Sequence, residues 1–394
     1  MNLKFFGCVL LVIGVAIGAG LLALPIATAA SGLIFSIPLI ILIWFIMTCC
    51  ALLILEVNLR LPINNNLITM AKATLGKPAS IIVWFAYLLL LYSLMAAYSA
   101  GGSDIIRELF FLLHISTPIW IDTLLFIGVL GFIVYKGIKS VDWANRGLML
   151  TKLAFFILLI LLITPHVETR FFPTANLHAV WPAIMVVVTS FGFAIVVPSL
   201  RVYLKSDKKQ LYSVVLIGSF VALVCYIAWV LAIQGNISQA QLMTIEHSGK
   251  SVTGLTAALI ERIHTPIIIT LVRGFASICM LTSFLGVALS LTDFIADGLK
   301  LKKAGKENII IYSVSFLPPM VIVLLFPGIF IKALSYAGIF CVIILILLPA
   351  LMAWQMRKKK TTEEVYQLWG GKPLLGLIII LGFILLAIGI FQTF

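Results

Sequence analysis

Long apolar runs, each ended by prolines, glycines or charged residues, recur along the whole chain. Each is close to the roughly 20 residues that an α-helix needs to cross a bilayer. The pattern therefore predicts an all-α membrane protein with eleven transmembrane helices. These lie near residues 5–29, 33–57, 80–101, 117–135, 147–165, 181–200, 211–234, 267–292, 308–326, 331–354 and 373–393.

Composition excludes a soluble domain. Hydrophobic residues make up 62% of the 394 residues and charged residues only 10%, with a mean hydropathy of +1.20. Soluble domains typically contain about 45–50% hydrophobic residues and about 25% charged residues. The first run is too long for a signal-peptide core, so we expect it to be retained as a span. All six cysteines lie in apolar stretches without metal-ligand spacing, which indicates neither disulfides nor a metal site.

The net charge of +13 is explained by membrane topology. If the N-terminus is cytoplasmic, 20 of the 27 lysines and arginines fall on the cytoplasmic side and six on the other. Such a bias sets orientation in membranes. We therefore expect a membrane protein with a cytoplasmic N-terminus whose eleven spans place Phe394 on the opposite side, and no nucleic-acid partner.

Two spans contain glycine followed by proline: residues 14–25 have three glycines ahead of Pro25, and residues 189–198 have Gly192 ahead of Pro198. Proline removes a backbone donor and crowds the preceding turn, so both helices should be interrupted. Matching breaks in two halves are typical of inverted-repeat transporters. We expect one transporter domain with repeats at about residues 5–165 and 181–354 and an extra helix at about 373–393. Close helix packing is the alternative explanation for these glycines.

These breaks and further stretches resemble the hydroxy/aromatic amino acid permease family, in particular its tyrosine-specific transport proteins. The similar stretches are residues 18–25, 54–57, 96–98, 189–193, 197–199, 282–289, 293–294, 316–319 and 336–338. The resemblance implies an amino acid-polyamine-organocation fold and proton-driven import of an aromatic amino acid across a bacterial inner membrane, so that Phe394 lies in the periplasm. Ala194 departs from it, because a histidine is expected there, and this difference concerns substrate preference.

Lys152 is the candidate for proton coupling. It lies about six residues into span five, roughly 9 Å deep at 1.5 Å per residue, where an ionisable group usually marks an ion route. The resemblance places it between the first helix and span eight. Its partners would be Thr282, Ser283 and carbonyls near Ala16 and Ile17. The alternative is a lysine that extends to the cytoplasmic interface.

Backbone groups freed by the breaks can bind an amino acid without water. Amides at 18–20 would bind the carboxylate, and carbonyls near Ser190 would accept from the ammonium. The phenylalanines beside Gly192 and a tyrosine of span three, Tyr92 or Tyr98, could contact an aromatic ring. The full substrate-binding set is Ile17, Gly18, Ala19, Gly20, Tyr92, Ser190, Phe191, Gly192 and Phe193.

Other charged residues have structural interpretations. Glu56 lies beside Arg60 at a helix end, and Asp293 is placed similarly, so we interpret both as ion-pair partners. Arg273 is a candidate for an external vestibule, unless its long stem carries it to the interface. The long connection at 235–266 predicts a short surface helix near 255–263.

The sequence therefore predicts a secondary transporter, without cofactor, that imports an aromatic amino acid with a proton. Tyrosine is the first expectation, then tryptophan or phenylalanine. The partners are the amino acid and the lipid bilayer. A sodium-coupled or exchange-type carrier of the same fold is the main alternative, because hydroxyls also ligate hard cations. An enzyme is disfavoured because no catalytic cluster or motif occurs, and a channel because broken repeats suit a carrier.

Overall fold

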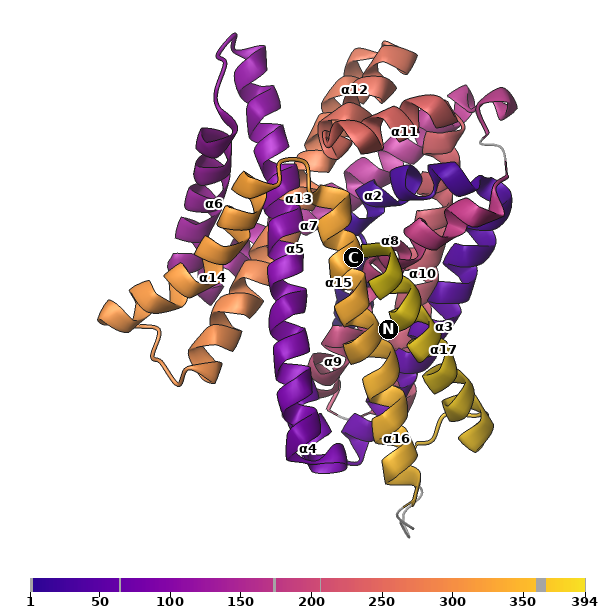
Figure 1. Cartoon of the computed structure of the whole chain (residues 1–394), viewed down its shortest axis with the longest axis vertical. Helices are drawn as coiled ribbons and strands as arrows, with labels where there is room; N and C mark the ends of the chain where they lie inside the picture. Colours follow the sequence, from indigo (N-terminus) through magenta and orange to yellow (C-terminus); the bar gives the residue numbers. More distant parts are fainter. Residues whose placement is uncertain (1–2, 64, 173–174, 206, 359–365, 394) are drawn as a thin grey trace.

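The computed structural model describes residues 3–63, 65–172, 175–205, 207–358 and 366–393, which form a helical bundle without β-strands in those ranges (Figure 1). The helices are α1 (Leu3–Ala16), α2 (Ala19–Ala27), α3 (Leu33–Leu59), α4 (Leu67–Leu75), α5 (Lys77–Leu112), α6 (Ile119–Tyr135), α7 (Ile138–Ile163), α8 (Val180–Ser190), α9 (Val197–Tyr203), α10 (Lys208–Gln234), α11 (Gln239–Ser248), α12 (Ser251–Ile263), α13 (Pro266–Gly298), α14 (Gly305–Leu325), α15 (Phe330–Cys341), α16 (Leu348–Lys358) and α17 (Gly371–Thr393).

The spans confirm a multi-pass membrane protein. Within the described ranges, nine helices are long and apolar enough to cross a bilayer, and the bent pair α1–α2 makes a tenth. Helix α6 has only 17 residues but is apolar and lies at the fourth predicted position. The exact number of eleven stays a prediction.

Both predicted interruptions are present. Helices α1 and α2 meet at a 45° bend, and α8 and α9 are separated by the 3₁₀ turn η5 (Gly192–Val196). A further irregularity, the π-helical segment η6 (Val342–Leu347), joins α15 to α16 and was not predicted. The discontinuous helices confirm the predicted fold class, whereas the boundaries of the two repeats stay a prediction.

The two ends of the bundle differ. Helix α4 and the end of α16 lie at one end, here the α4 end, and α11 and α12 lie at the opposite α11 end (Figure 1). Helix α12 corresponds to the surface helix predicted near 255–263. Helix α11 was not predicted, although Ser238 and Gln241 form a capping box at its start.

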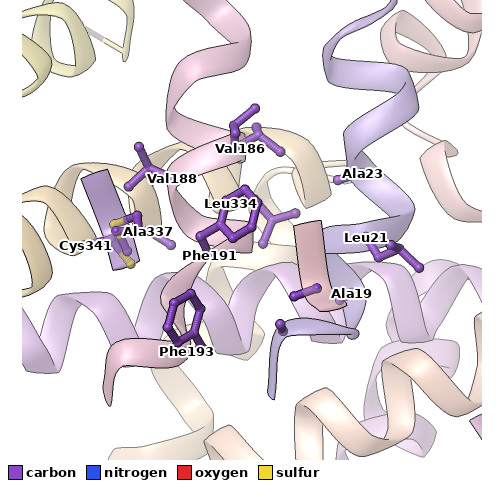
Figure 2. Close-up of a cluster of buried hydrophobic side chains, with 14 of the residues drawn as sticks. Ala19, Leu21, Ala23, Val186, Val188, Phe191, Phe193, Leu334, Ala337 and Cys341 are labelled. Atoms are coloured by element: carbon purple, nitrogen blue, oxygen red, sulfur yellow. The ribbon is translucent and has the colours of Figure 1, made fainter. Parts of the chain in front are cut away.

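The broken helices pack in the centre of the bundle. Figure 2 shows Ala19, Leu21 and Ala23 of α2 near side chains of α8 and α15. Helix α15 approaches α8 so closely that a Cβ on Gly338 would collide with the carbonyl oxygen of Met185. Small residues therefore let the backbones touch, as expected when helices associate in lipid.

Candidate functional site

The first break places the start of α2 in the buried centre of the bundle, where Ile17 and Ala19 are fully buried and residues 17–20 line neither of the two cavities described below. Gly18 has an extended backbone, and α2 begins at the next residue. The amide of Ala19 donates to Ser283 Oγ of α13 at 3.1 Å. Gly20 lies against the second break, because a Cβ there would lie 2.9 Å from Ser190 Oγ. A helix N-terminus carries partial positive charge, so this one can hold a carboxylate.

The second break presents a helix C-terminus, whose partial charge is negative, whereas the start of α2 is positive. Helix α8 ends at Ser190, and Pro198 falls in the first turn of α9. Carbonyls in the last turn of a helix have no intrahelical partner. Gly192 has open space on its Cβ side, with no heavy atom within 4 Å. The break therefore combines carbonyls that can accept from a cation with room beside them.

Lys152 of α7 connects the first break to α13. Its side chain is 1% exposed, and Nζ donates to the carbonyl oxygen of Gly14 at 3.2 Å and to Thr282 Oγ1 at 3.4 Å. The ammonium therefore lies inside the bundle rather than at the interface. Two details differ from the expectation: the carbonyl belongs to Gly14, not to Ala16 or Ile17, and Ser283 accepts from Ala19 instead.

Tyr226 of α10 joins the two breaks and was missed by the sequence analysis. Its fully buried hydroxyl lies 2.6 Å from the carbonyl oxygen of Ala16 and 2.5 Å from that of Ser190. These are the last residues of α1 and α8. A buried tyrosine hydroxyl needs a partner, but nothing in the sequence indicates which carbonyls it will find.

A cavity of about 440 Å³ lies beside both breaks. Its volume falls within the range of small-molecule sites, about 300–1,000 Å³. Ser199 and Ser290 line it as well, so it extends along α9 and α13 away from the breaks. The polar lining near the breaks consists of Lys152, Thr189, Thr282 and Ser283, with Gly14 and Gly192.

A second cavity of about 1150 Å³ is lined by residues of the α11 end, including Glu246, and by Lys332 at the start of α15. It reaches Ala96 of α5. The first cavity touches Tyr98, two residues further along the same helix. No described residue lines both. The two cavities thus come close to each other at the level of Ala96 and Tyr98 of α5, where side chains separate them.

The structure places three of the four predicted aromatic residues away from the wall of the smaller cavity. Phe191 and Phe193 are almost fully buried in the core cluster of Figure 2. The Phe191 ring packs edge-to-face on Tyr226, with 4.8 Å between centroids. Tyr92 is not on this wall either, and its hydroxyl donates to the carbonyl of Val314 at 2.8 Å. Tyr98 does line the cavity.

The remaining charged candidates are paired. Glu56 is fully buried and contacts Arg60, as interpreted, but also Arg357, which the sequence did not suggest. Asp293 pairs with Lys303 at 2.6 Å. Arg273 pairs with Glu108 at 2.9 Å and does not line the larger cavity.

The broken helices around central cavities define the fold of a membrane transporter. The structure of MhsT in complex with L-phenylalanine has a similar fold, with a TM-score of 0.68 at 14% identity over 100% of this chain and 99% of that one. The profile of the tryptophan/tyrosine permease family matches residues 1–389. The chain therefore belongs to this family, which confirms the predicted resemblance.

Named relatives span the whole chain. The tyrosine-specific transport system 2 of Haemophilus influenzae is 32% identical over 98% of this chain and 96% of its own length. Glutamine transporter 2 of Aliivibrio fischeri is 30% identical over 98% of this chain and 99% of its own length. Because the family consists of transporters, the chain is not an enzyme, as predicted.

Proposed function

We propose that the protein imports an aromatic amino acid, with tyrosine first and then tryptophan or phenylalanine, by proton symport across a bacterial inner membrane. The observation that carries this proposal is the buried ammonium of Lys152 between Gly14 and Thr282 beside the 440 Å³ cavity. Intramembrane ionisable groups of this kind typically belong to proton or ion routes. Family membership and the tyrosine-specific relative support the substrate class.

The site can hold the two charged ends of an amino acid separately. The carboxylate binds at the start of α2, where amides and the helix dipole favour an anion. The ammonium binds at the carbonyls that end α1 and α8. The side chain then extends into the cavity beside Tyr98, and Phe191 and Phe193 contact it only after they turn out of the core.

Proton coupling follows from what Lys152 connects. Its protonated ammonium ties α1 to α13 through two hydrogen bonds, whereas a neutral amine has one proton fewer and no charge for the Gly14 carbonyl. In the proposed cycle the lysine is charged while substrate is bound. Release of the proton to the cytoplasm then frees α1 to move, which resets the carrier by alternating access.

Orientation assigns the two cavities to the two sides of the membrane. The α4 end carries Lys72, the start of α5 at Lys77 and Arg357, so it faces the cytoplasm by the positive-inside rule. The N-terminus is then cytoplasmic. The smaller cavity belongs to the inward route and the larger one to the outward route.

Sodium coupling is the second candidate, because Thr282 and Ser283 supply hydroxyl oxygens suited to a hard cation. The observed contacts favour the proton. The Thr282 hydroxyl already accepts a hydrogen bond from the Lys152 ammonium, and the Ser283 hydroxyl accepts one from the amide of Ala19.

Uptake into proteoliposomes tests the proposal. We expect radiolabelled L-tyrosine or L-tryptophan to accumulate under an inward pH gradient without sodium, and an ionophore that dissipates the gradient to abolish accumulation. Competition by the twenty amino acids, glutamine included because a relative carries that name, defines the substrate. Accumulation that needs a sodium gradient contradicts proton coupling, and no inhibition by any aromatic amino acid contradicts the substrate class.

A further inference from the structure

We infer that the Tyr226 hydroxyl holds, in the empty carrier, the place that the substrate ammonium takes in the loaded carrier. The inference rests on the proposed amino acid substrate but assigns a role to a residue outside the proton pathway. It makes Tyr226 a positioning residue, which keeps the two broken helices together while no substrate is bound.

Two helix ends of the same polarity meet at this hydroxyl. Ala16 ends α1 and Ser190 ends α8, and their carbonyl oxygens lie 2.6 Å and 2.5 Å from the Tyr226 oxygen. Each helix C-terminus carries about half a negative charge. The place between them is therefore electrostatically suited to a cation, yet a neutral group occupies it.

Donor count makes the hydroxyl an incomplete partner. A phenol has one hydrogen, so it cannot donate fully to both carbonyls, whereas an ammonium has three and a full charge. Hydrogen bonds from a charged donor are roughly twice as strong as neutral ones. An ammonium that reaches this place therefore binds both carbonyls better than Tyr226 does, and displaces it.

The smaller cavity comes close enough for such an exchange. It touches Val15 and Thr189, which precede Ala16 and Ser190 in the chain, and it touches Gly192, the first residue of the turn at the second break. Phe191 packs on the Tyr226 ring, with the centroids 4.8 Å apart. Displacement of Tyr226 must therefore move Phe191 as well, which gives this buried ring a route toward the substrate side chain.

This arrangement has two measurable consequences. Substrate must compete with the hydroxyl, so Tyr226 weakens binding. The empty carrier, in contrast, needs the hydroxyl, because without it two buried carbonyls face each other with no donor between them. Loss of the hydroxyl should therefore strengthen binding and slow the return of the empty carrier. If the hydroxyl were purely structural, its loss would weaken substrate binding as well as slow the return of the empty carrier.

Tyr226→Phe tests the inference because it removes only the oxygen. We expect L-tyrosine or L-tryptophan to bind to the purified variant about two- to tenfold more tightly, the range that one net hydrogen bond supplies. In proteoliposomes, exchange of internal for external substrate should persist while net uptake falls. Tyr312→Phe is the matched control, since that hydroxyl donates to the Val134 carbonyl at 2.9 Å, away from the breaks, and should change neither.

The outcomes separate this inference from the proposed function. If the wild-type protein takes up none of tyrosine, tryptophan and phenylalanine, the proposed function fails and the inference fails with it. If the wild type transports but Tyr226→Phe binds with equal or lower affinity, the inference alone is overturned. A parallel loss of exchange and net uptake in a folded variant also overturns it.

Discussion

Glu56 and Arg357 form a buried two-point ion pair that ties α3 to the end of α16. Nε donates to Oε1 at 2.9 Å and Nη2 to Oε2 at 2.6 Å, with the two side chains 1% and 5% exposed. Oε2 also accepts from the amide of Leu368, and Arg60 contacts Oε1. The carboxylate thus organises three parts of the α4 end.

Truncation of Arg357 should destabilise the protein strongly. Among the described residues, Arg357→Ala leaves the buried Glu56 charge with Arg60 as its one remaining cationic contact, and removing one partner of a buried pair costs about 3–5 kcal/mol. We expect a large fall in the thermal unfolding temperature in detergent. Lys303→Ala, which breaks the more exposed pair with Asp293, is the control and should cost at most about 1 kcal/mol. Equal effects of the two variants would contradict this assignment.

The contact between α15 and α8 should be intolerant of a single methyl group. A Cβ at position 338 meets backbone atoms of Met185, which cannot turn away as a side chain would. We expect Gly338→Ala to separate the two helices, to cost about 1–3 kcal/mol, and to slow transport because α8 carries Thr189 and Ser190.

Gly128→Ala is the matched control for this contact. It is also a helical glycine, but a Cβ there would have no heavy atom within 4 Å. Unfolding temperatures and uptake rates of both variants check the prediction, and unchanged uptake by Gly338→Ala would show that the close contact is unimportant for movement.

Sequence patterns predicted the elements better than the contacts. Proline and glycine interrupt a helix locally, so both breaks could be placed from residues 14–25 and 189–198. Depth in an apolar run likewise singled out Lys152. Two contacts could not be predicted: the hydrogen bond from Lys152 to the Gly14 carbonyl, and the position of the Tyr226 hydroxyl between the two breaks. Both depend on how helices far apart in the sequence pack, which one sequence does not specify.

The same reason explains why the orientation of the aromatic side chains could not be predicted. Phe191 and Phe193 lie at the break, as their positions require, but whether a ring points to the cavity or the core depends on its neighbours. Arg357 was missed as the partner of Glu56 because 301 residues separate them.

Glu246 should make stability depend on pH. Desolvation raises the pKa of this carboxyl above its ordinary value, with His247 acting in the opposite direction. The folded state therefore binds the proton more tightly than the unfolded state, so this group lowers stability as pH rises through the ordinary carboxyl range near about 4.3, and the loss is complete above the folded pKa.

Glu246→Gln should remove that loss. We expect the variant to unfold at a higher temperature than the wild type at pH 7 and the difference to shrink below about pH 4.3, where the wild-type carboxyl is protonated. Glu261→Gln replaces an exposed carboxylate of α12 and serves as the control. A difference between wild type and Glu246→Gln that stays constant over this pH range would contradict the prediction.

Lys152 variants should separate coupling from binding. Lys152→Ala removes the ammonium that ties Gly14 to Thr282, so we expect substrate exchange to persist while accumulation driven by a pH gradient is lost. Lys152→Arg keeps a charge that does not dissociate in proteins. It should bind substrate but fail to complete net cycles, because α1 is never released. Lys306→Ala changes an exposed lysine at the start of α14 and should leave accumulation intact. Uphill accumulation by either Lys152 variant at the wild-type level would show that the proton takes another route.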